Sequence, residues 1–166
     1  MSKKILALML AFLLFSVIGI TATKTKHYTK ESLIEKYGFS EDRFEEDKYH
    51  GVKCISYDSL HSHAVSEYDQ LSYYIFSSEA AAKRAFDKGA GWFAKDAEVG
   101  DNYRKGWLTG VCDAHILGYE YLSGNMIIYV DLAILGCWGT KEEVENQPGP
   151  DYEYIDHIIE FINKEF

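Results

Sequence analysis

The sequence predicts an α+β domain, in which an antiparallel sheet of about five strands carries helices packed mainly on one face. Three observations lead to this fold class. Segments with the alternating polarity of β-strands fall into two groups, at 51–77 and 102–135. Segments with helical spacing of apolar residues precede, separate and follow these groups. The connections within each group are those of hairpins, which join antiparallel neighbours, so the predicted order is α-β-β-α-β-β-β-α.

The first helix is expected over residues 29–38. Thr29 can cap its N-terminus, Leu33 belongs to an apolar stripe along one face, and Gly38 is a typical stop signal. The segment that follows, SEDRFEEDKYH at 40–50, is densely charged around a single phenylalanine. It is interpreted as an exposed turn or a frayed helical turn.

Two strands are expected next, at 51–58 and 70–77. Both segments alternate in polarity and are rich in β-branched and aromatic residues. The stretch SLHSHAVSEYD, residues 59–69, lies between them. It is most simply a long hairpin loop.

The principal helix is expected over residues 77–97, directly after the second strand. Ser77 or Ser78 can cap it, and its apolar residues follow one helical stripe. Gly89 and Gly91 each cost about 1 kcal/mol relative to alanine inside a helix. We therefore expect either that the helix breaks at these glycines or that they let a strand approach closely.

Three further strands form a predicted meander at 102–111, 115–122 and 125–135. The tripeptide SGN at 123–125 is a tight-turn signature between the last two strands. The last strand is the most apolar, which indicates a central position covered on both faces. A final amphipathic helix is expected over 151–166, with its isoleucine-rich face docked on the sheet.

The N-terminus has the layout of a secretory signal peptide. Lys3 and Lys4 precede an uninterrupted apolar run at 5–20. The run is shorter than the roughly 20 apolar residues that cross a bilayer comfortably, so cleavage is favoured over permanent anchoring. The expected organisation is a signal peptide at 1–23 and a single domain at 24–166, with contact to a membrane only through an uncleaved N-terminal segment.

The charge of the expected mature chain disfavours polyanions as partners. Without Lys3 and Lys4, 15 basic residues face 26 acidic ones, a net charge of −11. Nucleic-acid binding normally requires a basic patch, so this class of partner is excluded. None of the phosphate-loop, dinucleotide-fold, zinc-protease or serine-elbow motifs occurs in the sequence, and no cofactor is expected.

His61 and His63 are weak candidate metal ligands in the predicted loop at 59–69. Imidazoles are common ligands, and Glu67 or Asp69 could add a carboxylate oxygen. Residues two positions apart, such as His61 and His63, point the same way only in an extended segment, and a distant third ligand is not evident. The favoured interpretation is therefore a solvated loop without a metal.

A second candidate polar site lies at the junction of two predicted strands, where Cys112, Asp113 and His115 are close in sequence. A thiolate, an imidazole and a carboxylate could form a cysteine nucleophile site, although sequence neighbours rarely converge in that way. A disulfide between Cys112 and Cys137 is the structural alternative, because the meander brings both to one end of the sheet. An intervening strand separates them by roughly 9 to 10 Å against a limit of about 7 Å. The sequence is compatible both with a disulfide between Cys112 and Cys137 and with two free buried thiols.

Asp131 completes the candidate polar site because it interrupts the most apolar strand. A buried carboxylate costs several kcal/mol unless it is paired. Asp131 could be a functional acid at a cleft. It could also pair with Arg104 or Lys105 across the sheet, or lie at an exposed strand edge.

Aromatic residues supply a possible ligand face. Aromatic residues are also what twisted antiparallel strands prefer, so a purely structural role stays open. The residues concerned are Trp107, Tyr119, Tyr121 and Trp138.

The first functional hypothesis is a secreted or cell-surface binding module for a protein, a peptide or a cell-wall ligand, without enzymatic activity. The alternative is a small extracellular hydrolase or metal-dependent enzyme that uses the His, Cys and Asp groups named above. The passage YYIFSSEAAAKRAFD, residues 73–87, is similar to strand-to-helix units of ferredoxin-like and other α+β sandwiches. That resemblance implies fold alone, because function belongs to sites rather than folds.

Overall fold

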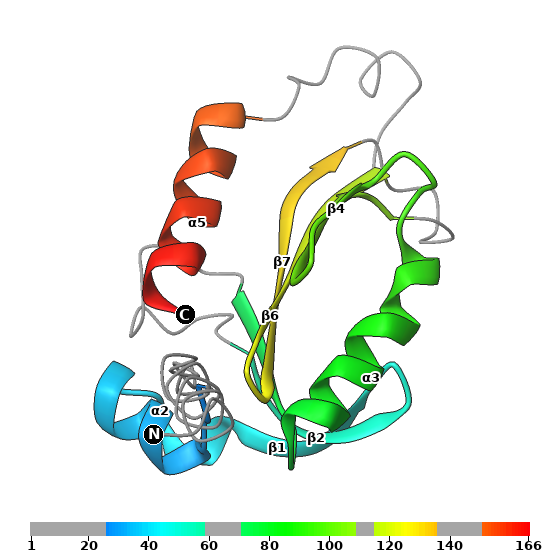
Figure 1. Cartoon of the computed structure of the whole chain (residues 1–166). Helices are drawn as coiled ribbons and strands as arrows, with labels where there is room; N and C mark the ends of the chain where they lie inside the picture. The colour runs from blue at the N-terminus through cyan, green and yellow to red at the C-terminus, as the bar shows by residue number, and fades with distance from the viewer. Residues whose placement is uncertain (1–25, 59–70, 109–114, 136–150) are drawn as a thin grey trace, which may run out of the picture.

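The computed structural model describes residues 26–58, 71–108, 115–135 and 151–166, which form an α+β fold (Figure 1). Within these residues, one antiparallel sheet has the strand order β1-β2-β3-β7-β6-β5-β4. The strands are β1 (Phe44–Tyr49), β2 (Val52–Asp58), β3 (Leu71–Ile75), β4 (Glu98–Val99), β5 (Tyr103–Trp107), β6 (His115–Ser123) and β7 (Met126–Leu135). The α-helices are α2 (Lys30–Tyr37), α3 (Glu79–Gly89) and α5 (Tyr152–Glu165).

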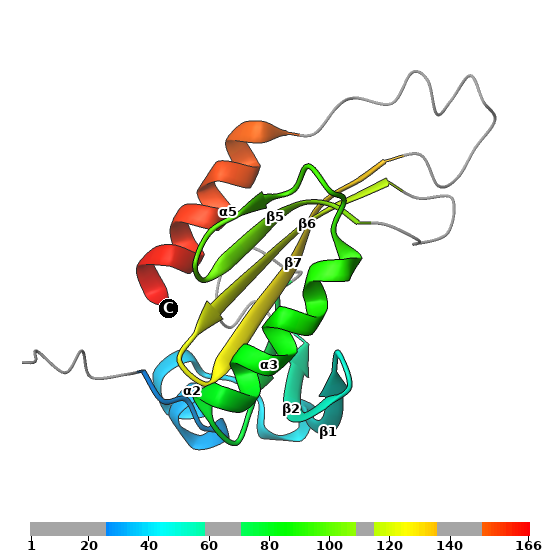
Figure 2. The ribbon, with the colours of Figure 1, turned by 45° about the vertical axis from the view of Figure 1, so that its right-hand side comes forward.

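The helices cover both faces of the sheet, so the expectation that they lie mainly on one face is wrong. Helix α3 lies on one side, and α5 lies on the other (Figure 2). Leu33 of α2 and Ile158 of α5 belong to one buried cluster, whereas Ala82 and Phe86 of α3 belong to a second cluster. The number of strands also differs, since the sheet of the described residues has seven strands rather than about five.

Helix α2 begins and ends at the predicted signals. The Thr29 hydroxyl accepts a hydrogen bond from the Ser32 amide, and the Ser32 hydroxyl accepts one from the Thr29 amide. These bonds satisfy donors that the first helical turn leaves free. Gly38 ends the helix in the left-handed conformation at φ 70°, which glycine adopts without steric cost.

The charged segment at 40–50 begins with a 3₁₀ turn at Glu41–Arg43, which agrees with the expected helical turn, but its larger part is the edge strand β1. Four of the six residues of β1 are solvent-exposed, so the strand lacks the alternation by which strands are recognised. Its pairing with β2 runs from Phe44↔Tyr57 to Tyr49↔Val52. The hairpin closes through His50 and Gly51 at φ 47° and 76°, the conformation of a two-residue type I′ turn.

The principal helix breaks at its glycines and is shorter than expected. Helix α3 ends at Gly89, and a 3₁₀ turn continues over Ala90–Trp92. The Ala90 amide donates to the Asp87 carbonyl instead of the Phe86 carbonyl, as expected for 3₁₀ geometry. The Phe86 carbonyl is thereby released for another donor.

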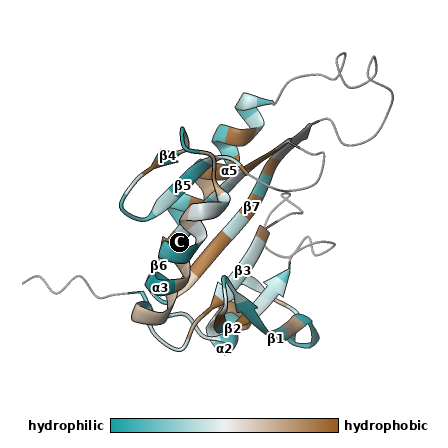
Figure 3. Ribbon diagram, turned by 90° about the vertical axis from the view of Figure 1, so that its right-hand side faces the viewer, coloured by the Kyte–Doolittle hydropathy of each residue, from teal (hydrophilic) through white to brown (hydrophobic). Residues whose placement is uncertain are grey.

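The predicted meander and the central position of the last strand are confirmed. Strand β7 pairs with β3 on one side and with β6 on the other, and β6 pairs with β5, all antiparallel. Apolar residues make up most of the described part of β7 (Figure 3). Met126 and Ile128 face one core cluster and Ile127 faces the other, so β7 is covered on both faces.

The turn between β6 and β7 ties the N-terminal segment to the sheet. The Asn125 side-chain amide donates to the carbonyls of Tyr28 and Phe76, and its oxygen accepts from the Tyr28 amide. Next to it, the Phe166 carbonyl accepts hydrogen bonds from the Tyr28 and Ser123 hydroxyls. Residues 26–28, the β6–β7 turn and the end of α5 therefore form one junction.

We expect Asn125→Ala to lower the free energy of unfolding by about 2 to 4 kcal/mol. The change removes three hydrogen bonds and leaves their buried partners, the Tyr28 amide and the carbonyls of Tyr28 and Phe76, without them. Urea denaturation measures the change. The matched control is Asn102→Ala, whose side chain makes one long bond of 3.4 Å to the Leu122 carbonyl. Equal losses for the two variants would contradict this role for Asn125.

Candidate functional site

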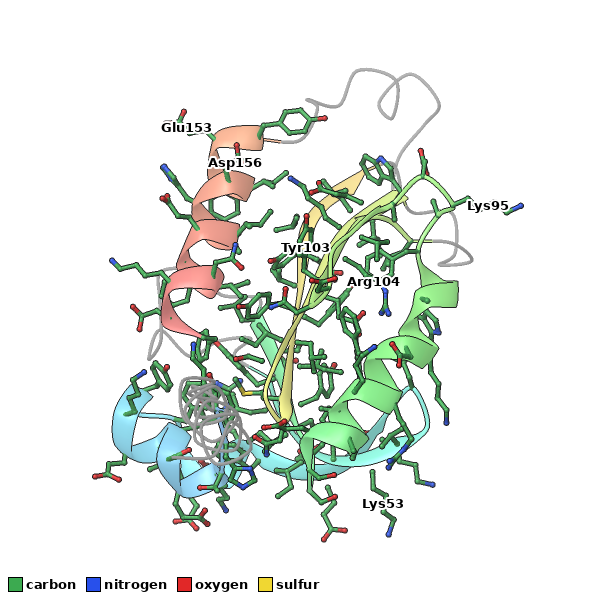
Figure 4. The ribbon with its side chains drawn as sticks, viewed as in Figure 1. Lys53, Lys95, Tyr103, Arg104, Glu153 and Asp156 are labelled. Carbon is green, nitrogen blue, oxygen red and sulfur yellow. The ribbon has the colours of Figure 1, made fainter. Side chains whose placement is uncertain are left out.

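An ion pair lies buried between the sheet and α3. Arg104 and Glu120 are directly opposite on β5 and β6, and Arg104 Nη1 donates to Glu120 Oε2 at 2.7 Å. The Glu120 side chain is 0% exposed. Arg104 also donates to the Phe86 carbonyl that α3 releases, and its guanidinium lies 3.7 Å from the Phe86 ring centroid (Figure 4). The pair therefore joins two strands to the end of α3, and Arg104 supplies an opposite charge to one oxygen of the buried carboxylate.

His50 faces the second oxygen of the same carboxylate. Its Nε2 lies 3.6 Å from Glu120 Oε1, and the His50 side chain is 6% exposed. Both atoms are buried, and neither has a hydrogen-bond partner among the described residues. The Trp92 ring packs edge-on against the imidazole, and the two ring centroids are 5.0 Å apart. The tip of the β1–β2 hairpin is thus inserted against the end of α3.

Gly89 provides the space for this insertion. A Cβ atom at residue 89 would lie 2.6 Å from His50 Nε2 and 3.1 Å from Glu120 Oε1. The first distance is shorter than real Cβ contacts allow. The sequence predicts either a helix break or a close approach at these glycines, and both occur at Gly89. Helix α3 ends there, and the His50 imidazole approaches it closely.

Tyrosines extend the polar cluster across the same face of the sheet. Tyr49 and Tyr74 stack with ring centroids 3.9 Å apart. Burial raises the pKa of Tyr49 well above its usual value, and the nearby Glu120 charge raises it further. Burial raises the pKa of Tyr74 to about 12. The phenols therefore stay neutral beside the buried carboxylate.

Asp131 lies on this face, but its partner differs from the two that sequence suggested. The Tyr129 hydroxyl donates to Asp131 Oδ1, and burial is the main cause of the raised pKa of Tyr129. Arg104 pairs with Glu120 instead, and Lys105 Nζ lies 4.0 Å from an Asp156 oxygen on α5.

Of the other members of the candidate polar and metal sites, His115 lies within the described residues. His115 is the first residue of β6 and pairs with Leu135 in the sheet. The remaining residues lie outside the described ranges, namely His61, His63, Cys112, Asp113 and Cys137, together with Trp138 of the ligand face.

The described members of the predicted ligand face lie under α5. Tyr119 is 1% exposed, and its hydroxyl donates to Asn163 Oδ1 of α5 at 3.2 Å. Trp107 and Tyr121 are partly buried against the same core cluster. Tyr119 is therefore part of the core, whereas Trp107 and Tyr121 lie at its border and stay partly exposed.

Sequence reasoning missed His50 and Glu120. Glu120 interrupts the strand HILGYEYL in the same way that Asp131 interrupts the next one, and this signal could have identified it. His50 gives no comparable signal, because its position follows from a hairpin turn after β1, whose residues do not alternate in polarity.

An open hollow of about 820 Å³ lies beside the β1–β2 hairpin. Its walls come from the segment before α2, from the hairpin, from the end of β3 and from Asn125. Ile55, which is 37% exposed, and Ile75 give it an apolar part. Lys48 and Lys53 give it cationic side chains, and Figure 4 shows Lys53 pointing away from α3.

Among the described residues, no group of three or more His, Cys, Asp or Glu side chains could hold a metal ion. No helix in the same residues is long and apolar enough to cross a membrane. Comparison with family models, with curated proteins and with solved structures found no match to this chain.

We expect Gly89→Ala to lower the free energy of unfolding by about 1 to 3 kcal/mol, because the new methyl group overlaps the His50 imidazole. Gly91→Ala is the matched control, since its Cβ would meet nothing within 4 Å. His50→Gly removes the imidazole and suits the left-handed turn, so Gly89→Ala should cost less in that background. Chemical denaturation is measured on the unmodified protein, the three single variants and the double variant, and additive losses for Gly89→Ala and His50→Gly would contradict the overlap.

The buried tyrosines predict an alkaline limit to stability. Their pKa values are higher in the folded protein than in the unfolded chain. The stability that their neutral forms contribute is therefore complete below about pH 10 and is lost as the pH rises toward the pKa of the folded state, which is about 12 for Tyr74. We expect these tyrosines to ionise only as the protein unfolds, measured by tyrosinate absorbance beside circular dichroism. Ionisation of all 13 tyrosines near pH 10 in a still-folded protein would contradict it. The residues concerned are Tyr49, Tyr73, Tyr74, Tyr119 and Tyr129.

Proposed function

We propose that this chain is an exported module that binds a protein, a peptide or a cell-wall ligand at the cell surface, and that the hollow beside the β1–β2 hairpin is its binding site. The hollow is the observation that carries the proposal. Its volume of about 820 Å³ falls in the usual range of ligand sites, roughly 300 to 1,000 Å³. Its mixture of apolar and charged side chains also suits a ligand that is partly apolar.

Export is supported by the sequence of the N-terminal segment. Lys3 and Lys4 followed by an apolar run match the layout of a secretory signal peptide. The described domain begins with Lys26 and Tyr28 fixed at the junction with Ser123, Asn125 and Phe166. Cleavage near residue 23 therefore leaves the contacts of the domain intact.

The hairpin that lines the hollow is held in place from its other face. His50 packs against Glu120 and Gly89, and Tyr49 stacks on Tyr74. These contacts fix the tip of a hairpin whose outer strand has an exposed edge. A wall that is already positioned costs less to order when a ligand binds.

A small extracellular hydrolase is the second candidate function, and one observation favours it. The His50 imidazole faces the buried carboxylate of Glu120, and a carboxylate that orients a histidine is a common arrangement in acid–base catalysis. A substrate would have to reach an imidazole that is 6% exposed. The open hollow requires no such rearrangement, which is why binding is preferred.

The test is selection of a random peptide library on the immobilised protein. We expect enriched peptides whose binding is lost in Ile55→Asp, because the charge removes the apolar part of the hollow. Val99→Asp is the matched control, since Val99 is 64% exposed on β4 at the opposite edge of the sheet. Thermal unfolding confirms that both variants fold. No enrichment, or equal loss in both variants, would contradict the hollow as the site.

A further inference from the structure

We propose that the ligand of the hollow is an acidic peptide segment, whose carboxylates are bound by the paired ammonium groups of Lys48 and Lys53. This inference rests on the proposed function and adds the chemical class of the partner. Both lysines line the hollow. They are directly opposite each other in the register of β1 and β2.

The pairing of these lysines is unfavourable in the free protein. The two-residue turn makes Tyr49 and Val52 the hydrogen-bonded pair that closes the hairpin, so Lys48 and Lys53 form the next, non-hydrogen-bonded pair. Side chains approach more closely in such pairs, and like charges directly opposite are destabilising. An anion between the two ammonium groups would convert this repulsion into attraction. Local violations of favourable pairing of this kind occur at functional sites.

No described carboxylate neutralises either lysine. The ion pairs of the described residues place Lys30, another lysine of the hollow, 3.3 Å from a Glu41 oxygen, and they include neither Lys48 nor Lys53. The two ammonium groups are therefore available to a ligand within the described part of the chain.

Two of the three acids that line the hollow already interact with other groups. Asp47 Oδ1 accepts the Lys48 backbone amide at 2.7 Å. Hydrogen bonds to its own backbone amide and to Thr29 lower the pKa of Glu31 at the start of α2. Glu46 is the third acid, and it lies opposite Ile55 in the register. The bonds of Asp47 and Glu31 leave their charges in place, but they hold these carboxylates on backbone amides and on Thr29 rather than on Lys48 or Lys53.

The hydrogen bond from the Lys48 amide to Asp47 favours a ligand that is bound by side chains over a ligand that adds a strand to the sheet. In the register of the hairpin, the Lys48 amide points away from β2, toward the free edge of β1. The Asp47 carboxylate occupies the position where the carbonyl of an added strand would bind. An acidic ligand is therefore expected in the hollow rather than along the edge of β1.

In the experiment, the purified protein is titrated with a hexaglutamate peptide that is blocked at both ends, and binding is monitored by backbone amide NMR. A salt concentration of about 0.15 M screens the long-range repulsion between the peptide and the acidic protein. We expect shifts at Lys48, Lys53 and Ile55. The double variant Lys48→Gln with Lys53→Gln should weaken binding about fivefold or more. The double variant Lys88→Gln with Lys95→Gln changes the same charge outside the hollow and should bind as the unmodified protein does.

Three outcomes would overturn the acidic class. These are equal binding of a blocked hexaglutamine peptide, equal weakening in the two double variants, and absence of shifts at the hairpin. If selected library peptides still depend on Ile55 in any of these cases, the hollow remains a binding site and only the charge of its ligand is wrong. If no peptide depends on Ile55, the proposed function fails as well.

Discussion

The carboxylate of Glu120 constrains much of the fold, because a charge without contact to solvent must be neutralised by groups that surround it. Arg104 meets this requirement from β5 and also satisfies the Phe86 carbonyl at the end of α3. His50 reaches the other carboxylate oxygen from the tip of the β1–β2 hairpin. One buried acid therefore joins a helix end to a neighbouring strand through Arg104, and the tip of a distant hairpin packs beside it.

The hairpin connects this buried cluster with the open surface. One face of the hairpin packs on the polar core, through Tyr49 and His50. Its other face presents Lys48 and Lys53 to the hollow. A strand of mostly exposed, charged residues is stable at the edge of a sheet because its neighbours hold it from one side. The register of β1 and β2 thereby places the two lysines at a defined spacing, although β1 has no fully buried apolar residues of its own.

Much of the fold was predictable because local chemistry agreed with the final structure. Thr29 and Gly38 mark the ends of α2, and the apolar run of β7 matches its central place. Strand β1 was missed because its residues contact solvent on both sides, so no period appears in the sequence. The position of helices on both faces depends on long-range packing rather than on local pattern. The candidate site was less predictable, since Glu120, His50 and Gly89 meet only through tertiary structure.

The junction at the Phe166 carbonyl has a mechanical consequence. Lys26, Tyr28 and Ser123 all contact that oxygen, and the Tyr28 backbone is bound by Asn125 in the adjacent turn. Residue 26 and residue 166 are therefore attached to the same small area of the domain. Tension applied between these two residues would load a few side-chain hydrogen bonds first. Only after they break would the force reach the strands, so the sheet is shielded from pulling along the chain.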